Sequence, residues 1–177
     1  MMLRTCRRRR WPAWLMRAAL LLWPCHPALA VERGALEAAI TFNLLQFVEW
    51  PGEGALPDGA PLTLCLKGDS PLMPPLRQLE GRPVRRMTLH VMAFEGAQHQ
   101  CQAVYVDSVQ AELEARNAMR EPALAIGASD YRSATRPSIQ LVFTQGRLAF
   151  DIDLRKSQQS GLVISSRLLK LARTVTE

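Results

Sequence analysis

The sequence predicts an α/β fold, a single-domain sandwich in which helices flank a mixed β-sheet. Short apolar runs typical of strands alternate with amphipathic segments typical of helices over the first two thirds of the domain, and a hairpin and a helix follow. A chain of 177 residues is long enough for one domain with a full hydrophobic core and too short for two.

The first thirty residues have the three parts of an export signal. Six of the 22 basic residues lie there, as an arginine cluster, and no acidic residue does. The apolar run AALLLW follows, and the small-x-small motif ALA at 28–30 precedes Val31. We therefore expect a cleaved signal peptide over 1–30, a mature domain over 31–177 and a periplasmic location.

Two alternatives to a cleaved signal fit less well. A membrane anchor needs an uninterrupted apolar run of about 18 residues, which Arg17 and Pro24 prevent. Lipid attachment at Cys25 would require small residues before this cysteine, whereas the bulky Trp23 and Pro24 precede it. The paired arginines leave export of the folded protein open as a route.

The domain beyond the signal is formally neutral, because it contains 16 basic and 16 acidic residues. A neutral domain offers no electrostatic attraction to the phosphate backbone of DNA or RNA. We therefore expect no nucleic-acid partner.

The first element is a nearly all-apolar helix expected over 35–49. Its polar residues Asn43, Gln46 and Glu49 are three apart and form one thin stripe. The helix is expected to stop at Trp50, because the residue before a proline is pushed out of the helical region. The aromatic residues of this helix are expected in the core, whereas Trp50, at its irregular end, is a candidate for a pocket or an interface.

The middle of the chain is expected to alternate strands and helices. A strand at 62–66 precedes a helix that Asp69 or Ser70 would cap, with Pro71 at the first helical position. Glu112 would reach Arg116 on the helix that follows Ser108. This helix is expected at 108–119, and the remaining strands are expected at 84–92, 103–106 and 123–127.

The last part of the chain is expected to form a hairpin and a helix. The runs IQLVFT and RLAFDIDL flank Gln145-Gly146, a two-residue linker suited to a tight turn. Ser165 or Ser166 would cap the final helix. Its apolar positions form one face, made of Leu168, Leu169, Leu171, Ala172 and Val175.

Export leaves two of the four cysteines, Cys65 and Cys101, as an even pair in an oxidising compartment. This is the setting of a structural disulfide. The competing interpretation is a metal site that adds His90 and His99, but no C-x-x-C or H-x-x-x-H pair is present to organise it. We therefore expect the Cys65–Cys101 disulfide, no metal site and no cofactor.

The sequence makes no positive case for an enzyme. KGDSPL resembles the nucleophile block of GDSL-type esterases, but no histidine follows His99 to act as the base, and Ser70 is better explained as a helix cap. Asp151 and Asp153 flank Ile152 and so share one face of a strand. A solvated strand face explains this pair better than an acid and its base.

Basic residues recur along the final helix at Arg167, Lys170 and Arg173. One interpretation is a solvated face with cations near a helix C-terminus. The other is a docking surface for an acidic partner or an anionic ligand.

Several blocks resemble the YfiR-like family of periplasmic proteins in their order and spacing. These are AAITFNLLQFVEWP, LTLCLKGDSPL, ALAIGASDY, GRLAFDIDL and GLVISSRLLKLA, and they extend over 35–175. The first block is the most specific, because the family's NFxxFxEWP is matched by Asn43, Phe47, Glu49, Trp50 and Pro51. FDIDL resembles the family's FEINL, and Cys65 and Cys101 fall where its strand-linking disulfide is expected. SATRPS stands where the family has a Gly-rich loop.

The resemblance implies a periplasmic regulator that binds and inhibits the sensor domain of an inner-membrane diguanylate cyclase, lowering cyclic di-GMP and limiting biofilm formation. It also implies an outer-membrane lipoprotein as a second partner, and a homodimer is a further possibility it raises. The membrane partner could instead be a sensor kinase. Glu49 and Trp50, with Asp151 and the basic residues above, are the candidate contacts. The alternative is a small-ligand module with its pocket near Asp151 and Arg167.

Overall fold

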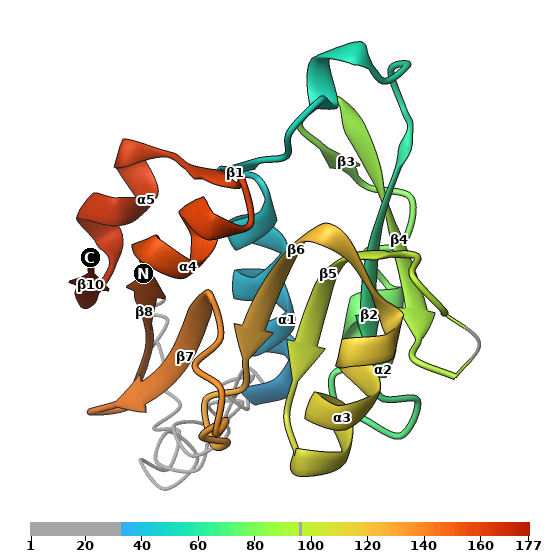
Figure 1. Ribbon diagram of the computed structural model, residues 1–177. Helices are drawn as coiled ribbons and strands as arrows, with labels where there is room; N and C mark the ends of the chain where they lie inside the picture. The colour runs from blue at the N-terminus through green and yellow to red at the C-terminus, as the bar shows by residue number, and fades with distance from the viewer. Residues whose placement is uncertain (1–32, 96) are drawn as a thin grey trace, which may run out of the picture. The chain divides into compact units, whose positions relative to one another are not determined.

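An eight-stranded mixed sheet organises this computed structural model, which describes residues 33–95 and 97–177 (Figure 1). Its strand order is β10-β8-β7-β6-β5-β2-β4-β3. Neighbouring strands are parallel except in the pairs β3/β4 and β7/β8. The strands are β2 (Pro61–Leu66), β3 (Pro83–Val84), β4 (Met87–Ala93), β5 (Cys101–Val106), β6 (Met119–Gly127), β7 (Ile139–Thr144), β8 (Arg147–Asp153) and β10 (Thr174–Thr176). A separate two-stranded ribbon pairs β1 (Val48–Glu49) with β9 (Val163–Ile164).

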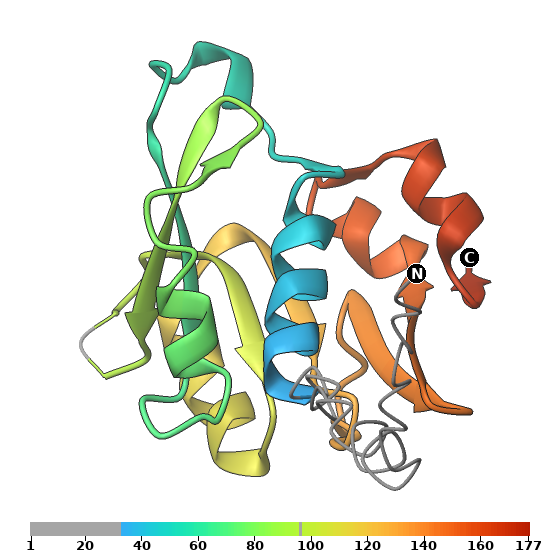
Figure 2. The same ribbon diagram turned by 180° about the vertical axis from the view of Figure 1, so that it is seen from behind.

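Helices cover both faces of the sheet, so the α/β fold with a mixed sheet is confirmed. The helices α1 and α2 lie on one face and α3 lies on the other, while α4 and α5 lie near the end of the sheet formed by β8 and β10 (Figures 1 and 2). Their bounds are α1 (Arg33–Leu45), α2 (Met73–Arg77), α3 (Val109–Ala118), α4 (Leu154–Gln159) and α5 (Ser166–Leu171), with a 3₁₀ turn, η1, at Glu53–Ala55. None of these helices has the length and apolar character needed to cross a membrane.

The two faces of the sheet bury two separate hydrophobic clusters, because successive residues of a strand point to opposite sides. Leu64 and Tyr105 pack in the larger cluster with α1 and α2. Cys65 and Val104 pack in the smaller cluster with the alanine-rich inner face of α3. The strands β2 and β5 thus contribute to both cores and form the centre of the domain.

Local signals are confirmed where the partner lies within a few residues. Ser108 caps α3 by accepting a hydrogen bond from the Ala111 N–H, and Ser165 caps α5 through the Leu168 N–H. Gln145 and Gly146 both have positive φ, at 51° and 74°, and join β7 to β8 as the predicted hairpin.

The first helix is shorter than predicted. It ends at Leu45, not at 49, and Val48 and Glu49 instead pair antiparallel with Ile164 and Val163. The Gln46 side chain fixes the exit turn by donating to the Pro83 carbonyl at 2.8 Å. Hydrogen bonds to a strand more than a hundred residues away therefore replace the last helical turn.

The strand predicted at 84–92 is a hairpin made of β3 and β4. The chain reverses at Arg85, whose φ of 55° is left-handed. Its guanidinium is held by Glu53 at 2.9 Å and by Glu49 at 3.1 Å. These ion pairs favour a turn where the alternating pattern predicted a continuous strand.

The second helix begins later than predicted, at Met73, with Leu72 as its N-cap residue. Pro71 is therefore not its first residue. Ser70 accepts from the Leu72 N–H at 3.3 Å and donates to Asp107 at 2.5 Å, so it orders the turn before the helix.

The final helix ends at Leu171, and residues 174–176 form β10. Ala172 is already extended, and the Arg173 N–H donates to the Phe150 carbonyl at 2.8 Å. The single apolar face predicted for this helix is consequently wrong: Leu168 is buried, but Leu171 is 68% exposed.

Candidate functional site

Three of the predicted contact residues lie on the β1–β9 ribbon and on α5, which follows the ribbon directly in the chain, and we call this segment the docking face. It consists of Glu49, Val163, Arg167, Lys170 and Leu171. Glu49 lies opposite Val163 in the ribbon, and directly opposed residues project to the same side. On the other side Val48 and Ile164 are buried. The chain passes from β9 through the cap residue Ser165 directly into α5, which carries the other three.

The docking face combines exposed apolar side chains with basic ones. Val163 is 58% exposed and Leu171 is 68% exposed, and Arg167 and Lys170 are both exposed on α5. The Glu49 carboxylate is partly neutralised by Arg85 at 3.1 Å. The face is therefore net basic, with an apolar component that water solvates poorly.

Trp50, which the sequence made a candidate for a pocket or an interface, does not lie on this face. Its side chain is only 6% exposed, and its Nε1–H donates to the Gln102 carbonyl at 3.3 Å. Gln102 in turn accepts from the Thr63 N–H at 2.8 Å. Trp50 is thus a core residue that supports Glu49 and the ribbon from behind.

Arg173 does not continue the basic stripe of α5, because it follows the end of that helix. It forms a two-pronged ion pair with Asp151, with Nε–Oδ1 at 2.8 Å and Nη2–Oδ2 at 2.5 Å. The hydrogen bonds from Arg173 lower the pKa of Asp151. The predicted stripe of three cations is reduced to Arg167 and Lys170.

Asp151 and Arg173 line a separate polar groove of about 460 Å³, which we call the arginine groove. Arg132 and Arg136 also line it, and both are exposed. Arg167 is not among its lining residues, so the pocket expected near Asp151 and Arg167 lacks Arg167.

Asp151 and Asp153 are each occupied by a structural partner. Asp153 accepts from the Lys156 N–H at 2.9 Å and so caps α4, while Asp151 binds Arg173. Both carboxylates serve as hydrogen-bond acceptors in the fold, and the geometry gives no support to an acid–base pair.

A buried carboxylate that was not predicted from the sequence, Glu37, lies on the inner face of α1. It is 4% exposed. It accepts from the Tyr105 hydroxyl at 2.5 Å, from the Ser129 hydroxyl and from Arg33 at 3.3 Å. Burial and the Glu37 carboxylate raise the pKa of Tyr105. The signal was a single acidic residue within the apolar stretch ALEAAITF.

This cluster lies where open α/β sheets usually have their crevice. The chain leaves β2 toward β4 and leaves β5 toward β6, so the winding direction reverses between these neighbouring strands. Glu37 and Tyr105 line a cavity of about 180 Å³ there, together with Asp107 at the carboxyl end of β5. Because the Glu37 oxygens already have protein partners, the cluster primarily joins α1 to the sheet.

The Cys65–Cys101 disulfide is present and joins the neighbouring strands β2 and β5. The Cα atoms are 5.7 Å apart, and both residues are fully buried beneath α3. Across residues 33–95 and 97–177, no group of three or more His, Cys, Asp or Glu side chains could hold a metal ion.

Comparison with known proteins places the chain in context. A family model described as YfiR/HmsC-like matches residues 34–173. No match was found among curated proteins. A conserved domain protein from Vibrio cholerae O1 biovar El Tor has a similar crystal structure, with a TM-score of 0.50 and 10% identity over 81% of this chain and 60% of that one.

A second solved structure gives a weaker match. The ABC domain from Streptococcus pneumoniae in complex with L-Trp has a TM-score of 0.48 and 9% identity over 78% of this chain. The chain covers 60% of the length of each of these two structures. The Vibrio match supports the α/β fold alone.

Proposed function

Because this chain belongs to the YfiR/HmsC-like family, we propose that it is a periplasmic protein that binds and inhibits the sensor domain of an inner-membrane diguanylate cyclase. Inhibition would lower cyclic di-GMP and limit biofilm formation. The observation that carries the proposal is the family match over residues 34–173, which takes in the sheet strands β2 to β8, α5 and the β1–β9 ribbon. The regulator acts by binding, and we propose no catalytic residue.

The chemistry of the docking face supports this proposal. Protein interfaces combine an apolar centre with a polar rim and are enriched in arginine. Val163 and Leu171 supply exposed apolar area, and Arg167 and Lys170 supply positive charge beside it. A partner surface with an apolar patch and acidic residues would match this face.

Other partners are compatible with the same face. A sensor kinase would present a comparable periplasmic domain, and an outer-membrane lipoprotein that covered the docking face would release the cyclase. A homodimer through this face would also compete with the cyclase. Size-exclusion chromatography of the protein alone and with each purified partner domain separates these arrangements.

The direct test measures binding of the purified protein to the periplasmic domain of the candidate cyclase. Reversing Arg167→Glu and Lys170→Glu together should reduce the association rate at least tenfold at low salt and less at high salt, because exposed charges steer the encounter. The matched control reverses Arg120 and Arg147, which are exposed on β6 and β8, with the same change in net charge. Equal association rates for the two double variants would exclude the docking face as the steering surface.

The apolar part of the face is tested by Leu171→Ala. This change should raise the dissociation rate with little effect on association, since buried apolar contacts act mainly after the encounter. Leu113→Ala on α3 is the control, because Leu113 is 52% exposed and lies outside the docking face. In cells, deleting the gene should raise cyclic di-GMP, and expression of the Arg167/Lys170 variant should fail to restore the low level. Restoration by that variant would contradict the proposed role of the face.

The arginine groove favours a second candidate function, a module that binds a small anion and reports it to a membrane sensor. Arg132 and Arg136 are exposed at a groove of about 460 Å³, beside the Asp151–Arg173 ion pair. Calorimetric titration with small carboxylates, in the presence and absence of the cyclase domain, distinguishes this function from direct inhibition.

A further inference from the structure

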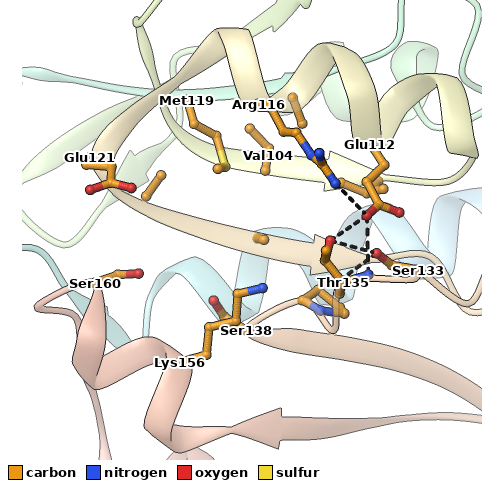
Figure 3. Close-up of a pocket in the computed structure, with 15 residues that line it drawn as sticks. Val104, Glu112, Arg116, Met119, Glu121, Ser133, Thr135, Ser138, Lys156 and Ser160 are labelled. Atoms are coloured by element: carbon orange, nitrogen blue, oxygen red, sulfur yellow. Dashed lines mark hydrogen bonds and ion pairs between the residues drawn. The ribbon is translucent and has the colours of Figure 1, made fainter.

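A third pocket lies on the α3 side of the sheet, between α3 with β6 and the segment 133–138 with α4 (Figure 3). We call it the apolar pocket, and its volume is about 150 Å³. Its floor is made of aliphatic side chains and a thioether from β5, α3 and β6: Val104, Val106, Ala115, Met119, Ala123 and Ala125. It shares Ser133 and Pro137 with the arginine groove but differs from it in chemistry.

One wall of the apolar pocket is fastened by Glu112. Its carboxylate accepts from the Tyr131 hydroxyl at 3.0 Å, from the Thr135 N–H at 3.3 Å and from the Thr135 hydroxyl. Arg116 adds an ion pair at 3.7 Å (Figure 3). The hydrogen bond from the Thr135 hydroxyl is the main reason that the pKa of Glu112 is lowered to about 2, so Glu112 is ionised near neutral pH. We call this set of hydrogen bonds and the ion pair the Glu112 clamp.

The opposite wall, formed by α4, is held just as firmly. Asp153 accepts from the Lys156 N–H at 2.9 Å, and the Ser157 hydroxyl donates to the Asp153 carbonyl at 2.9 Å. The Lys156 ammonium donates to the Arg136 carbonyl and so ties α4 to the loop. Because neither wall depends on a ligand for its hydrogen bonds, the pocket is preformed, and filling it requires little ordering of side chains.

The size of the pocket restricts what it can hold. A dry apolar cavity of about 150 Å³ accepts a benzene molecule, and the volume here is the same. The floor is aliphatic, and Ser133, Ser138 and Ser160 are also among the lining residues. The Ser133 hydroxyl already donates to the Thr135 carbonyl at 2.5 Å, so Ser138, which is buried, and Ser160 supply the hydroxyls for a ligand. A single ring with a small polar group would place its apolar part on the floor and its polar group at these hydroxyls.

The charges at the rim are balanced. Arg116 and Lys156 carry positive charge, and Glu112 and Glu121 carry negative charge. Three of these four are engaged within the protein, Glu112 with Arg116 and Lys156 with a backbone carbonyl. The rim therefore offers no net charge to select a small anion or cation.

We propose that the apolar pocket is a binding site for a small neutral ring compound that carries one hydroxyl group. The ring fills the space between Val104, Met119 and Ala125, and the hydroxyl exchanges hydrogen bonds with the Ser138 and Ser160 hydroxyls that line the pocket. The site is independent of the proposed regulatory function, because its floor and walls contain no residue of the docking face.

The test uses phenol and benzene as probes, because they have the same ring and differ by one hydroxyl group. The protein isolated from the periplasm is titrated with each probe and followed by the NMR signals of the Met119 and Ala125 methyl groups. Both probes should shift these signals in a saturable way with one-to-one stoichiometry, and phenol should bind several-fold more tightly than benzene.

Two variants fill the pocket by degrees. Ala125→Val should weaken phenol binding several-fold, and Ala125→Leu should abolish it, while circular dichroism reports whether each variant is folded. Ala149→Leu is the matched control, because Ala149 is also a half-buried strand residue and lines none of the pockets described above. If wild-type protein shows no saturable shift with either probe at millimolar concentration, or if folded Ala125→Val binds phenol as well as Ala149→Leu does, the proposal is wrong.

Discussion

Of the three glutamates that are buried within residues 33–95 and 97–177, Glu53 is paired with Arg85, whereas Glu37 and Glu112 are stabilised by hydroxyl donors. Glu37 is 4% exposed and Glu112 is 9% exposed. A buried carboxylate is costly unless hydrogen bonds replace its hydration. Glu37 accepts hydrogen bonds from the Tyr105 and Ser129 hydroxyls, and Glu112 accepts them from the Tyr131 and Thr135 hydroxyls. Both residues therefore join a helix to a distant segment, α1 to the sheet and α3 to the loop beside the apolar pocket.

Glu112→Gln should lower stability at neutral pH by about 1–3 kcal/mol, because charge-assisted hydrogen bonds become neutral ones. The pKa of Glu112 is about 2 in the folded protein, below its ordinary value of 4.5. A depressed pKa contributes stability above about 4.5 that is lost as pH falls toward 2. Urea unfolding at a series of pH values should show a shallower acid decline for the variant than for the wild type.

Asp58→Asn is the control for this pH profile, because the Asp58 side chain is 77% exposed in its ion pair with Arg86. It should leave the acid decline of the wild type unchanged. An acid decline in Glu112→Gln as steep as that of the wild type would contradict the role assigned to the Glu112 clamp.

At the scale of elements, turns and caps determine where strands and helices begin and end. The β7–β8 hairpin depends on two consecutive residues with positive φ, and Gly146 is the one that pays no steric cost there. The docking face depends on two short elements, β9 and α5, joined at the Ser165 cap. Such short elements are stable through their connections, since a six-residue helix is marginal by itself.

Gly146→Ala should destabilise the protein by about 1–2 kcal/mol, because an alanine at a φ of 74° is strained even though no atom lies within 4 Å of the added Cβ. Gly54→Ala is the matched control: it also meets no atom within 4 Å, and its φ is not positive. Thermal unfolding should show a decrease in Tm of roughly 2–6 °C for Gly146→Ala and little change for Gly54→Ala. Equal Tm values for the two variants would contradict the steric argument.

At the scale of the whole molecule, the Cys65–Cys101 disulfide joins the two central strands. It closes a loop with a sequence separation of 36 and includes the β3–β4 hairpin. Both cysteines are fully buried, so a reductant reaches the bond only when the strands or α3 open. Reduction of the bond therefore requires that the centre of the sheet opens first.

Cys65→Ser should lower the free energy of unfolding by roughly 2–4 kcal/mol, since the unfolded chain gains the entropy that the loop constrains. The exported wild-type domain, which lacks Cys6 and Cys25, should show no reactive thiol in denaturant. Binding of the cyclase domain, measured below the unfolding temperature of the variant, separates a structural bond from redox control. Unchanged binding by folded Cys65→Ser leaves the disulfide structural, and a weakened partner affinity supports regulation through reduction. Thiol labelling of the denatured native protein would disprove the bond itself.

The sequence alone determined the α/β class, the order of most elements, the disulfide pair, the Ser108 and Ser165 caps and the Gln145-Gly146 turn. Most of these features depend on residues close in the chain or on a burial pattern with a fixed period, and the disulfide pair follows from counting cysteines. The family resemblance over residues 35–175 was likewise carried by local motifs, and the match over 34–173 confirms it.

Only the tertiary structure decided where the first and last helices end and which side chains are exposed. Val48 and Glu49 lie outside the first helix because they pair with Ile164 and Val163. Arg173 lies outside α5 and forms an ion pair with Asp151 on β8. Trp50 is buried, and Glu37 is satisfied by hydroxyls 68 and 92 residues away. In each case a partner distant in the chain offers hydrogen bonds or burial worth more than the local preference, and no sequence window contains both partners.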